Sequence, residues 1–272
     1  MSKTGNSYLK RWLTGIILAP ILLIAILFGP KEIFAAIIII FILGGVWEYN
    51  HIVFGNGFKK EKIEGLIFAI IIPLFVFFGN NQHLLAVLAF SVLIVFILFV
   101  LSIKETNFDV LAVAKVIFVI MYIPFLMSYF ISLRMMEKGK EWIFFVLILA
   151  FIGDIVALYV GKYFGRHKLV PLVSPGKTVE GLAGLILGST IACLIFSYYF
   201  LPEISLMQIA ILAIAGSIIG QMGDLCESAI KRNYGLKDAS SILPGHGGVL
   251  DRLDCLIFIA PFVYYYRIFV IK

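Results

Sequence analysis

Charged side chains are scarce in this sequence. They make up 14% of the 272 residues, whereas 62% of the residues are hydrophobic and the mean hydropathy is +1.06. Because about a quarter of the residues in an ordinary soluble domain are charged, this scarcity excludes a soluble globular domain and indicates an integral membrane protein. The net charge of +6 is therefore assigned to loops on the cytoplasmic side of a membrane, and no nucleic-acid partner is expected.

Cysteine is also rare, with Cys193, Cys226 and Cys255 all lying in or beside apolar runs. Their spacing excludes a disulfide framework and a zinc site, so they are interpreted as small apolar side chains. Internal repeats, low-complexity tracts and a soluble domain are also missing from the pattern. We therefore expect a single polytopic membrane domain over residues 1–272, with N-terminal helices in 1–105, middle helices in 106–178 and C-terminal helices that carry the chemistry in 179–272.

Long apolar runs recur along the whole chain, and a helix needs about 20 such residues to cross a bilayer. Helices are expected because lipid offers no partners to free backbone groups and no alternating strand pattern is present. The nine predicted spans are 12–29, 33–54, 63–79, 84–103, 110–133, 142–164, 179–201, 206–230 and 253–270. The first is interpreted as a retained span, because no small-x-small cleavage pattern follows it. The predicted fold class is an all-α integral membrane protein.

Lysine and arginine are distributed unequally between the two sides of this arrangement. With the N-terminus inside, fifteen of them fall on the cytoplasmic side and six on the outer side. This asymmetry predicts a cytoplasmic N-terminus. It also places the two longest connections, 161–178 and 231–252, in the cytoplasm, where nucleotides are available.

Acidic residues gather within or at the ends of the later apolar runs. An acid at the bilayer centre costs about 2.5–3.5 kcal/mol on insertion scales, so the cluster requires a reason. The acids are Asp154, Glu180, Asp224, Glu227, Asp251 and Asp254. One reason is metal or substrate binding. The other, which stays open especially for Asp254 and Glu180, is a structural ion pair with Lys231, Arg232 or Arg252, or a helix cap.

Helical spacing brings some of these acids onto common faces. Asp224, Glu227, Ser228 and Lys231 follow one another at i, i+3, i+4 and i+7, and Asp251 and Asp254 at i, i+3. If the last two predicted helices pack together, their carboxylates meet near the cytoplasmic surface. Carboxylates that meet repel one another unless a cation neutralises them, and hard oxygen ligands suit Mg²⁺. We expect metal binding at Asp224 and Asp251, with Glu227 and Asp254 as weaker candidates.

Basic and glycine residues near the last span indicate a phosphate-rich ligand. Glycines at 245, 247 and 248 would let backbone N–H groups approach an anion at the start of the last helix. The cations of the same connection are Lys231, Arg232, Lys237 and Arg252. Within "SPGKTVEG", the residues Gly176-Lys177-Thr178 resemble the end of a P-loop, but Pro171 stands where a P-loop needs its first glycine. Lys177 can still contact phosphate from a turn at a helix start.

The stretch "SAIKRNYGLKDASSILPGHGGVLDRLD", residues 228–254, closely resembles the signature of bacterial phosphatidate cytidylyltransferases, also called CDP-diacylglycerol synthases. We call this stretch the signature. The stretches "GDIVALYVGKYFGRHKL" and "SPGKTVEG" are similar to the same family, so the resemblance covers about residues 150–255. The fixed positions of the signature are all present: Ser228, Lys231, Arg232, Lys237, Asp238, His246, Gly247, Gly248, Asp251, Arg252 and Asp254.

The resemblance implies a nucleotidyltransferase that converts CTP and phosphatidic acid into CDP-diacylglycerol and pyrophosphate with Mg²⁺. It implies a multi-pass protein of the bacterial inner membrane, a site facing the cytoplasm and a homodimer, and it leaves a second cation open. Asp224 and Asp251 match the family's metal-binding aspartates. The residues expected to act on the reacting phosphates are Asp224, Asp251, Lys231, Arg232 and Arg252, and those expected to bind substrate are Lys177, Ser228, Lys237, His246, Gly247 and Gly248. For His246 a turn-stabilising role stays open.

Three other functions are alternatives to this one. A cation-coupled transporter would place acids and broken helices near the midplane, often in two related halves, but here the polar residues gather near one surface. A phosphotransferase that uses CDP-diacylglycerol requires an Asp-Gly, Ala-Arg, Gly, Asp pattern that the sequence lacks. A cytidylyltransferase acting on another lipid phosphate, such as an ether lipid, remains the nearest alternative.

Overall fold

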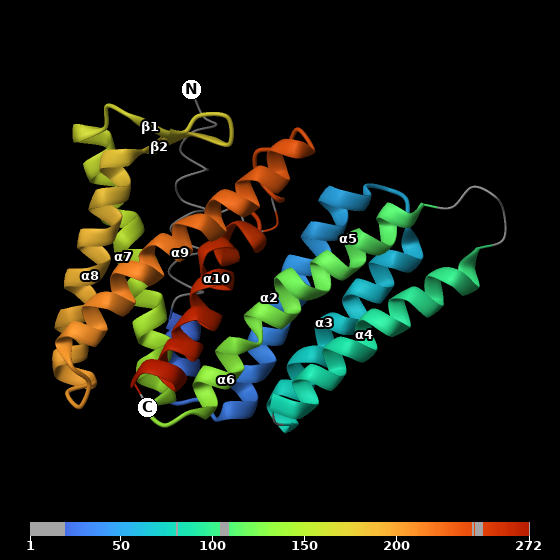
Figure 1. Cartoon of the computed structure of the whole chain (residues 1–272), viewed down its shortest axis with the longest axis horizontal. Coiled ribbons are helices and arrows are strands. Elements are labelled where there is room, and N and C mark those ends of the chain that lie inside the picture. The colour runs from blue at the N-terminus through green and yellow to red at the C-terminus, as the bar shows by residue number, and fades with distance from the viewer. Residues whose placement is uncertain (1–19, 80, 104–108, 241, 243–246, 272) are drawn as a thin grey trace. The chain divides into compact units, whose positions relative to one another are not determined.

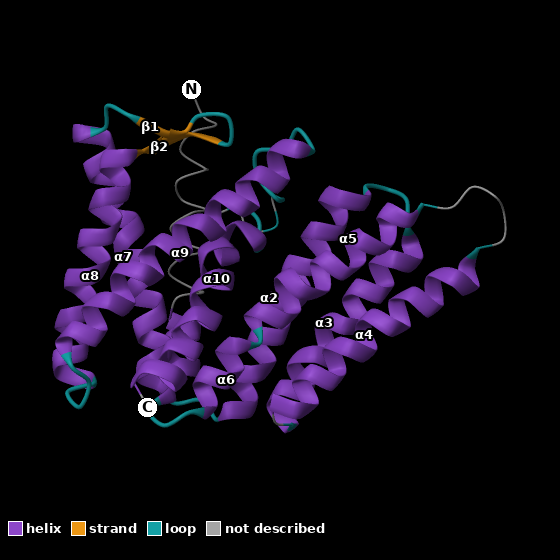
Figure 2. Ribbon diagram, viewed as in Figure 1, coloured by secondary structure: helices purple, strands orange, loops and turns teal. Residues whose placement is uncertain are grey.

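The computed structural model describes residues 20–79, 81–103, 109–240, 242 and 247–271, and these residues are almost entirely helical (Figures 1 and 2). In addition to the numbered helices, residues 20–27 are helical. The helices are α2 (Lys31–Phe54), α3 (Lys59–Phe78), α4 (Asn81–Ser102), α5 (Val110–Ile120), α6 (Tyr129–Met135), α7 (Gly139–Phe164), α8 (Val179–Phe200), α9 (Leu206–Asn233) and α10 (Leu250–Tyr266). The fold also contains two π-helical turns, Met121–Phe125 and Arg267–Ile271. It has two strands, β1 (Lys168–Val170) and β2 (Ser174–Thr178).

Seven helical segments within the described residues are long and apolar enough to cross a membrane. They match seven of the predicted spans, so a multi-pass helical membrane protein is confirmed. The third predicted span is also a helix, α3, but charged side chains crowd its start and it is not among the seven. The part of the first predicted span before residue 20 lies outside the described residues. The side of the membrane on which each connection lies stays a prediction.

The fifth span changes helix type in its middle. Residues 110–135 form α5, a π-helical turn and α6 in succession. Pro124 lies in the π-helical turn, and proline cannot donate the backbone hydrogen bond that an α-helix requires. The carbonyl of Pro124 itself accepts both the N–H of Ser128 at 3.1 Å and the hydroxyl of Ser128 at 2.5 Å.

The chain divides into two compact units. Unit 1 contains residues 1–132 and 238–251, and unit 2 contains residues 133–237 and 252–272. In unit 1, α3 packs against α2, α4 and α5 around buried aliphatic side chains such as Ile42, Val46 and Ile72. In unit 2, α8 packs against both α7 and α9.

Small residues set the close packing of α7 on α8 in unit 2. A Cβ atom at Gly184 would lie 2.8 Å from Val160, and one at Gly188 would lie 2.6 Å from Val156. The hydroxyl of Ser189 donates to the carbonyl of Leu149 at 2.8 Å across the same interface. These contacts pack α7 closely against α8 from the hairpin end to the middle of α8.

The hairpin β1–β2 was not among the predicted elements. Its strands are antiparallel, with Lys168 opposite Thr178 and Val170 opposite Ser174. Glu180 in the first turn of α8 fixes the hairpin's start, because its carboxylate accepts the backbone N–H of Arg166 at 3.0 Å and lies 2.7 Å from Nδ1 of His167. Of the two roles left open for Glu180, the structure favours the structural one.

Candidate functional site

A polar cavity of about 380 Å³ lies in unit 2, between the C-terminal half of α7, the β2–α8 junction and α9. Its polar lining combines two acids with two lysines. The residues that line it are Asp154, Ala157, Leu158, Gly161, Lys162, Gly176, Lys177, Thr178, Gly181, Leu182, Leu185, Gln221 and Asp224. The motif "SPGKT" and the acidic face of α9, predicted separately as functional, therefore meet at one cavity.

Lys177 and Asp224 form an ion pair at this cavity. Their side chains are 22% and 29% exposed, so the pair is only partly screened by water. The hydroxyl of Ser228, one turn further along α9, donates to Asp224 at 3.4 Å. The predicted face of α9 is thus present around Asp224, and the lysine expected to contact phosphate binds this carboxylate.

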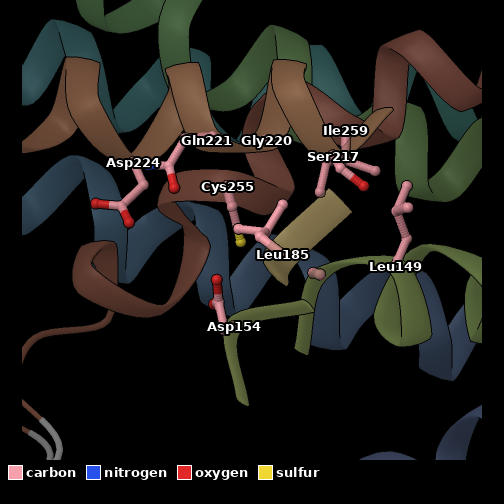
Figure 3. Close-up of a pocket in the computed structure, with 10 residues that line it drawn as sticks. Leu149, Asp154, Leu185, Ser217, Gly220, Gln221, Asp224, Cys255 and Ile259 are labelled. Atoms are coloured by element: carbon pink, nitrogen blue, oxygen red, sulfur yellow. The ribbon is translucent and has the colours of Figure 1, made fainter. Parts of the chain in front are cut away.

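Asp154 and Asp224 also face a second, narrower gap of about 10 Å³ (Figure 3). Figure 3 shows Asp154 of α7, Gln221 and Asp224 of α9 and Cys255 of α10 around it. Gln221 is 7% exposed, and its side-chain nitrogen has no hydrogen-bond partner among the described residues. An unpaired buried amide is costly, so Gln221 is a candidate to donate to a bound molecule. Sequence reasoning missed it, because a glutamine on an apolar helix carries no charge to attract notice.

Close contact between α9 and α10 brings Asp254 to the same region. A Cβ atom at Gly223 would lie 2.6 Å from the carbonyl oxygen of Asp254, so only glycine permits this approach. Asp254 is near enough to Asp224 and Asp154 for their charges to interact. Three carboxylates in unit 2 therefore lie within electrostatic range of one another, and Asp154 joins the candidates proposed from spacing alone.

The other charges on α9 are occupied by protein partners. Glu227 and Lys231 are both buried and form an i, i+4 ion pair. The guanidinium of Arg232 donates to the carbonyl oxygens of Val173 and Leu236, each at 3.2 Å, and so ties the β1–β2 turn to the end of α9. These contacts support the structural interpretation for Glu227, and metal or phosphate binding by the three side chains stays a prediction.

The start of α8 has its backbone donors satisfied. The N–H of Val179 donates to the carbonyl of His167 at 2.9 Å, and the N–H of Gly181 donates to the hydroxyl of Thr178 at 3.0 Å. The N–H of Glu180 bonds to its own carboxylate. The phosphate contact expected at this turn therefore has to come from the Lys177 side chain and the helix dipole.

Unit 1 contains the middle of the signature, residues 238–251. The carboxylate of Asp251 accepts the N–H of Gly248 at 2.7 Å and that of Ala239 at 3.0 Å. Gly247 has φ +80°, and a Cβ atom there would lie 2.8 Å from the same carboxylate. The anion approached by these glycines is thus Asp251 itself, while contact with a substrate phosphate stays a prediction.

Two of the remaining predicted residues lie at the protein surface. Lys237 and Arg252 are exposed. His246 lies outside the described residues, as does Gly245. Arg252 is close enough to Asp154 for their charges to interact, as is Lys177.

No metal site is preassembled from three or more His, Cys, Asp or Glu side chains in the part of the chain that the structure describes. The donors at the cavity nevertheless suit Mg²⁺, because Asp154 and Asp224 present carboxylate oxygens to one gap. Sequence reasoning also missed Glu48 of α2, which is fully buried and contacts the signature. Its signal in the sequence was an acid within an apolar run, in "GVWEYN".

Comparison with known proteins identifies the class. The model of the cytidylyltransferase family matches residues 9–270, so the chain belongs to this family. It is similar to the phosphatidate cytidylyltransferase of Bacillus subtilis (strain 168), with 32% identity over 264 residues that cover 94% of this chain and 96% of that protein.

Staphylococcal proteins of the same name are similar too. The one from Staphylococcus epidermidis (strain ATCC 12228) is 32% identical over 76% of this chain and 80% of its own length. The one from Staphylococcus saprophyticus is 36% identical over 67% of this chain and 68% of its own length. The resemblance noted from the signature is confirmed by these matches.

Proposed function

We propose that this chain is a phosphatidate cytidylyltransferase, which transfers CMP from CTP to phosphatidic acid and releases pyrophosphate. The observation that carries the proposal is the family match over residues 9–270 together with near full-length similarity to enzymes of that name. A phosphate oxygen of phosphatidic acid attacks the α-phosphorus of CTP. The bond between the α-phosphorus and the bridging oxygen breaks, and pyrophosphate leaves with that oxygen.

The reaction needs little proton transfer, because its nucleophile is already an anion. Catalysis then depends on positioning and on neutralising the charge of the phosphates. The ammonium group of Lys177 is proposed for this task. Its ion pair with Asp224 at the cavity and the partial positive charge at the N-terminus of α8 support the proposal. Lys231, Arg232, Lys237 and Arg252 are proposed to hold phosphates of either substrate.

Asp224 and Asp251 are proposed as the Mg²⁺ ligands, with Asp154, Glu227 and Asp254 as further candidates. When bound, Mg²⁺ would supply charge neutralisation at the triphosphate and polarise the α-phosphorus. The protein's own part is to hold the carboxylates in place. Lys177 binds that of Asp224, and the backbone N–H groups of Ala239 and Gly248 bind that of Asp251.

The setting proposed for this chemistry is the cytoplasmic face of a bacterial inner membrane. A site there is reached by CTP from water and by phosphatidic acid from the membrane, with membrane lipids around the helices. The asymmetry of fifteen against six Lys and Arg residues supports this orientation. A homodimer is proposed from the family resemblance.

The test is turnover by purified protein in detergent. Labelled CTP, phosphatidic acid and Mg²⁺ are expected to give CDP-diacylglycerol and pyrophosphate, and no product with any lipid phosphate or divalent ion would overturn the proposal. Replacing phosphatidic acid by an ether-lipid phosphate in the same assay identifies the lipid substrate. A faster rate with the ether lipid would favour the alternative substrate.

The assigned carboxylates are tested separately. Asp224→Asn and Asp251→Asn keep the size of each side chain, so folded protein with turnover at least about 100-fold below wild type is expected from loss of one catalytic cation site. Gel filtration and thermal unfolding in detergent verify folding. If both variants turn over near the wild-type rate, the metal assignment is wrong while the cytidylyltransferase function stands.

A further inference from the structure

Glu48 lies in the last two turns of α2, and its carboxylate contacts the signature nearly 200 residues away in the sequence. It is 0% exposed. Oε1 accepts the hydroxyl of Ser240 at 2.5 Å and the N–H of Val249 at 2.8 Å, and Oε2 accepts the N–H of Leu250 at 2.7 Å. All these residues belong to unit 1.

The donors that Glu48 binds come from both described ends of the signature's middle segment. Ser240 follows the residues that leave α9, whereas Val249 and Leu250 form the entry to α10. Leu250 is the first residue of α10, so the carboxylate also lies at a helix N-terminus, where a negative charge is favourable. The Glu48 side chain therefore links the two described ends of the segment to α2 and caps the helix that carries Asp251.

Two glycines make room for this contact. A Cβ atom at Gly248 would lie 2.6 Å from Oε2 of Glu48 and 2.7 Å from Oε1. On α2 itself, a Cβ atom at Gly44 would lie 3.2 Å from the side chain of Val249. The glycine at 248 is thus explained by the close approach of the Glu48 carboxylate. This explanation differs from the expected approach of a substrate phosphate.

The carboxylate of Asp251 also binds both described ends of the segment. Its carboxylate accepts the N–H of Ala239, beside Ser240, and the N–H of Gly248, beside Val249. The position of Asp251 therefore depends on the two ends of the segment that Glu48 also binds. Loss of the Glu48 contacts would leave the Ser240 hydroxyl and two buried backbone N–H groups without their acceptor, and buried donors without an acceptor destabilise a structure.

We propose that Glu48 is a positioning residue for the nucleotidyl transfer, which holds Ser240, Val249 and Leu250 of the signature and through them Asp251. It touches neither substrate in this proposal, which rests on the proposed function. The N-terminal half of the chain, which contains none of the fixed positions of the signature, then has a part in positioning Asp251.

The test compares Glu48→Gln with Glu32→Gln, the same change at an exposed position of the same helix. Glutamine at 48 keeps the size but loses the charge and one acceptor. We expect kcat to fall about 10- to 100-fold, the equivalent of one or two lost charged hydrogen bonds, with KM for CTP changed less than threefold. Hydrogen exchange in residues 238–250 should become faster, and Glu32→Gln should match wild type in both measurements.

Two further variants keep the test decisive. Ser240→Ala removes one donor and is expected to give a smaller fall in kcat and faster exchange in the same segment, even if Glu48→Gln does not fold. Glu48→Asp, which keeps the charge, should recover part of the lost kcat. Wild-type kcat and unchanged exchange in Glu48→Gln and in Ser240→Ala would overturn the inference. An inactive wild-type enzyme would instead overturn the proposed function, and the exchange measurement would still report on Glu48.

Discussion

Lys177 and Asp224 are 47 residues apart in the sequence and form one ion pair at the cavity of unit 2. The sequence predicted both as functional but assigned them to different partners. Spacing rules relate residues within one helix, whereas this contact depends on where the β1–β2 hairpin places Lys177. The pairing therefore could not be read from the sequence.

Lys177→Met is expected to lower kcat/KM for CTP at least about 100-fold, because one charge-assisted contact to phosphate is worth about 1.5–3 kcal/mol and Asp224 also loses its partner. Lys168→Met is the matched control. Lys168 lies in the same hairpin but donates to the carbonyl of Pro175 at 2.8 Å, outside the cavity lining. Steady-state kinetics checks both, and equal effects of the two variants would contradict a specific role for Lys177.

Gln221→Leu removes the buried amide that lacks a protein partner. If the amide donates to substrate, kcat/KM should fall about tenfold, as expected for one hydrogen bond. The midpoint of thermal unfolding should stay equal or rise, because an unpaired polar group is replaced by an apolar one. A loss of stability without a change in kcat/KM would show that Gln221 has only a packing role.

At the scale of elements, the helices were predictable and their partners were not. Apolar runs and helical spacing predicted the long spans and the common face of Asp224 and Ser228. Nothing local predicted the hairpin β1–β2, whose strands are three and five residues long. Glu48 was missed for a similar reason, since its partners lie about 200 residues away.

Gly188→Ala is expected to destabilise the α7–α8 pair by about 1–3 kcal/mol, because a methyl group there meets Val156 at 2.6 Å. Gly57→Ala is the control, since the nearest atom to a Cβ there is 3.8 Å away. Thermal unfolding in detergent should separate the two variants. A Gly188→Ala protein as stable as Gly57→Ala would mean that the helices shift apart at no cost.

The connections before α7 and α9 are joined by a surface ion pair, in which Lys138 donates to Glu203 at 2.6 Å. This hydrogen bond lowers the pKa of Glu203 below its ordinary value of 4.5. A lowered pKa in the folded protein means that the pair stabilises at neutral pH and that this contribution is lost as the pH falls through the folded value. Because the carboxylate is half exposed, Glu203→Gln should cost less than about 1 kcal/mol at pH 7, and this cost should shrink as the pH falls below 4.5, as measured by thermal unfolding.

At the scale of the whole molecule, orientation is the main prediction still to be measured. A single cysteine at position 59 should react with a membrane-impermeant maleimide only after cells are opened, and one at position 202 should react in intact cells. The three native cysteines are free, and Cys226 is exposed, so they are replaced first. The reverse labelling pattern would invert the topology inferred from Lys and Arg.

The satisfied donors at the start of α8 bear on the selectivity of the enzyme. A helix start with free N–H groups holds phosphate oxygens in fixed directions, whereas an ammonium group on a flexible stem responds mainly to charge. The Lys177 end of the cavity is therefore expected to accept any polyphosphate, and inorganic triphosphate should compete with CTP there. The choice of cytosine over other bases would then depend on contacts away from α8. Variants at position 177 should therefore weaken the binding of all nucleoside triphosphates to the same degree.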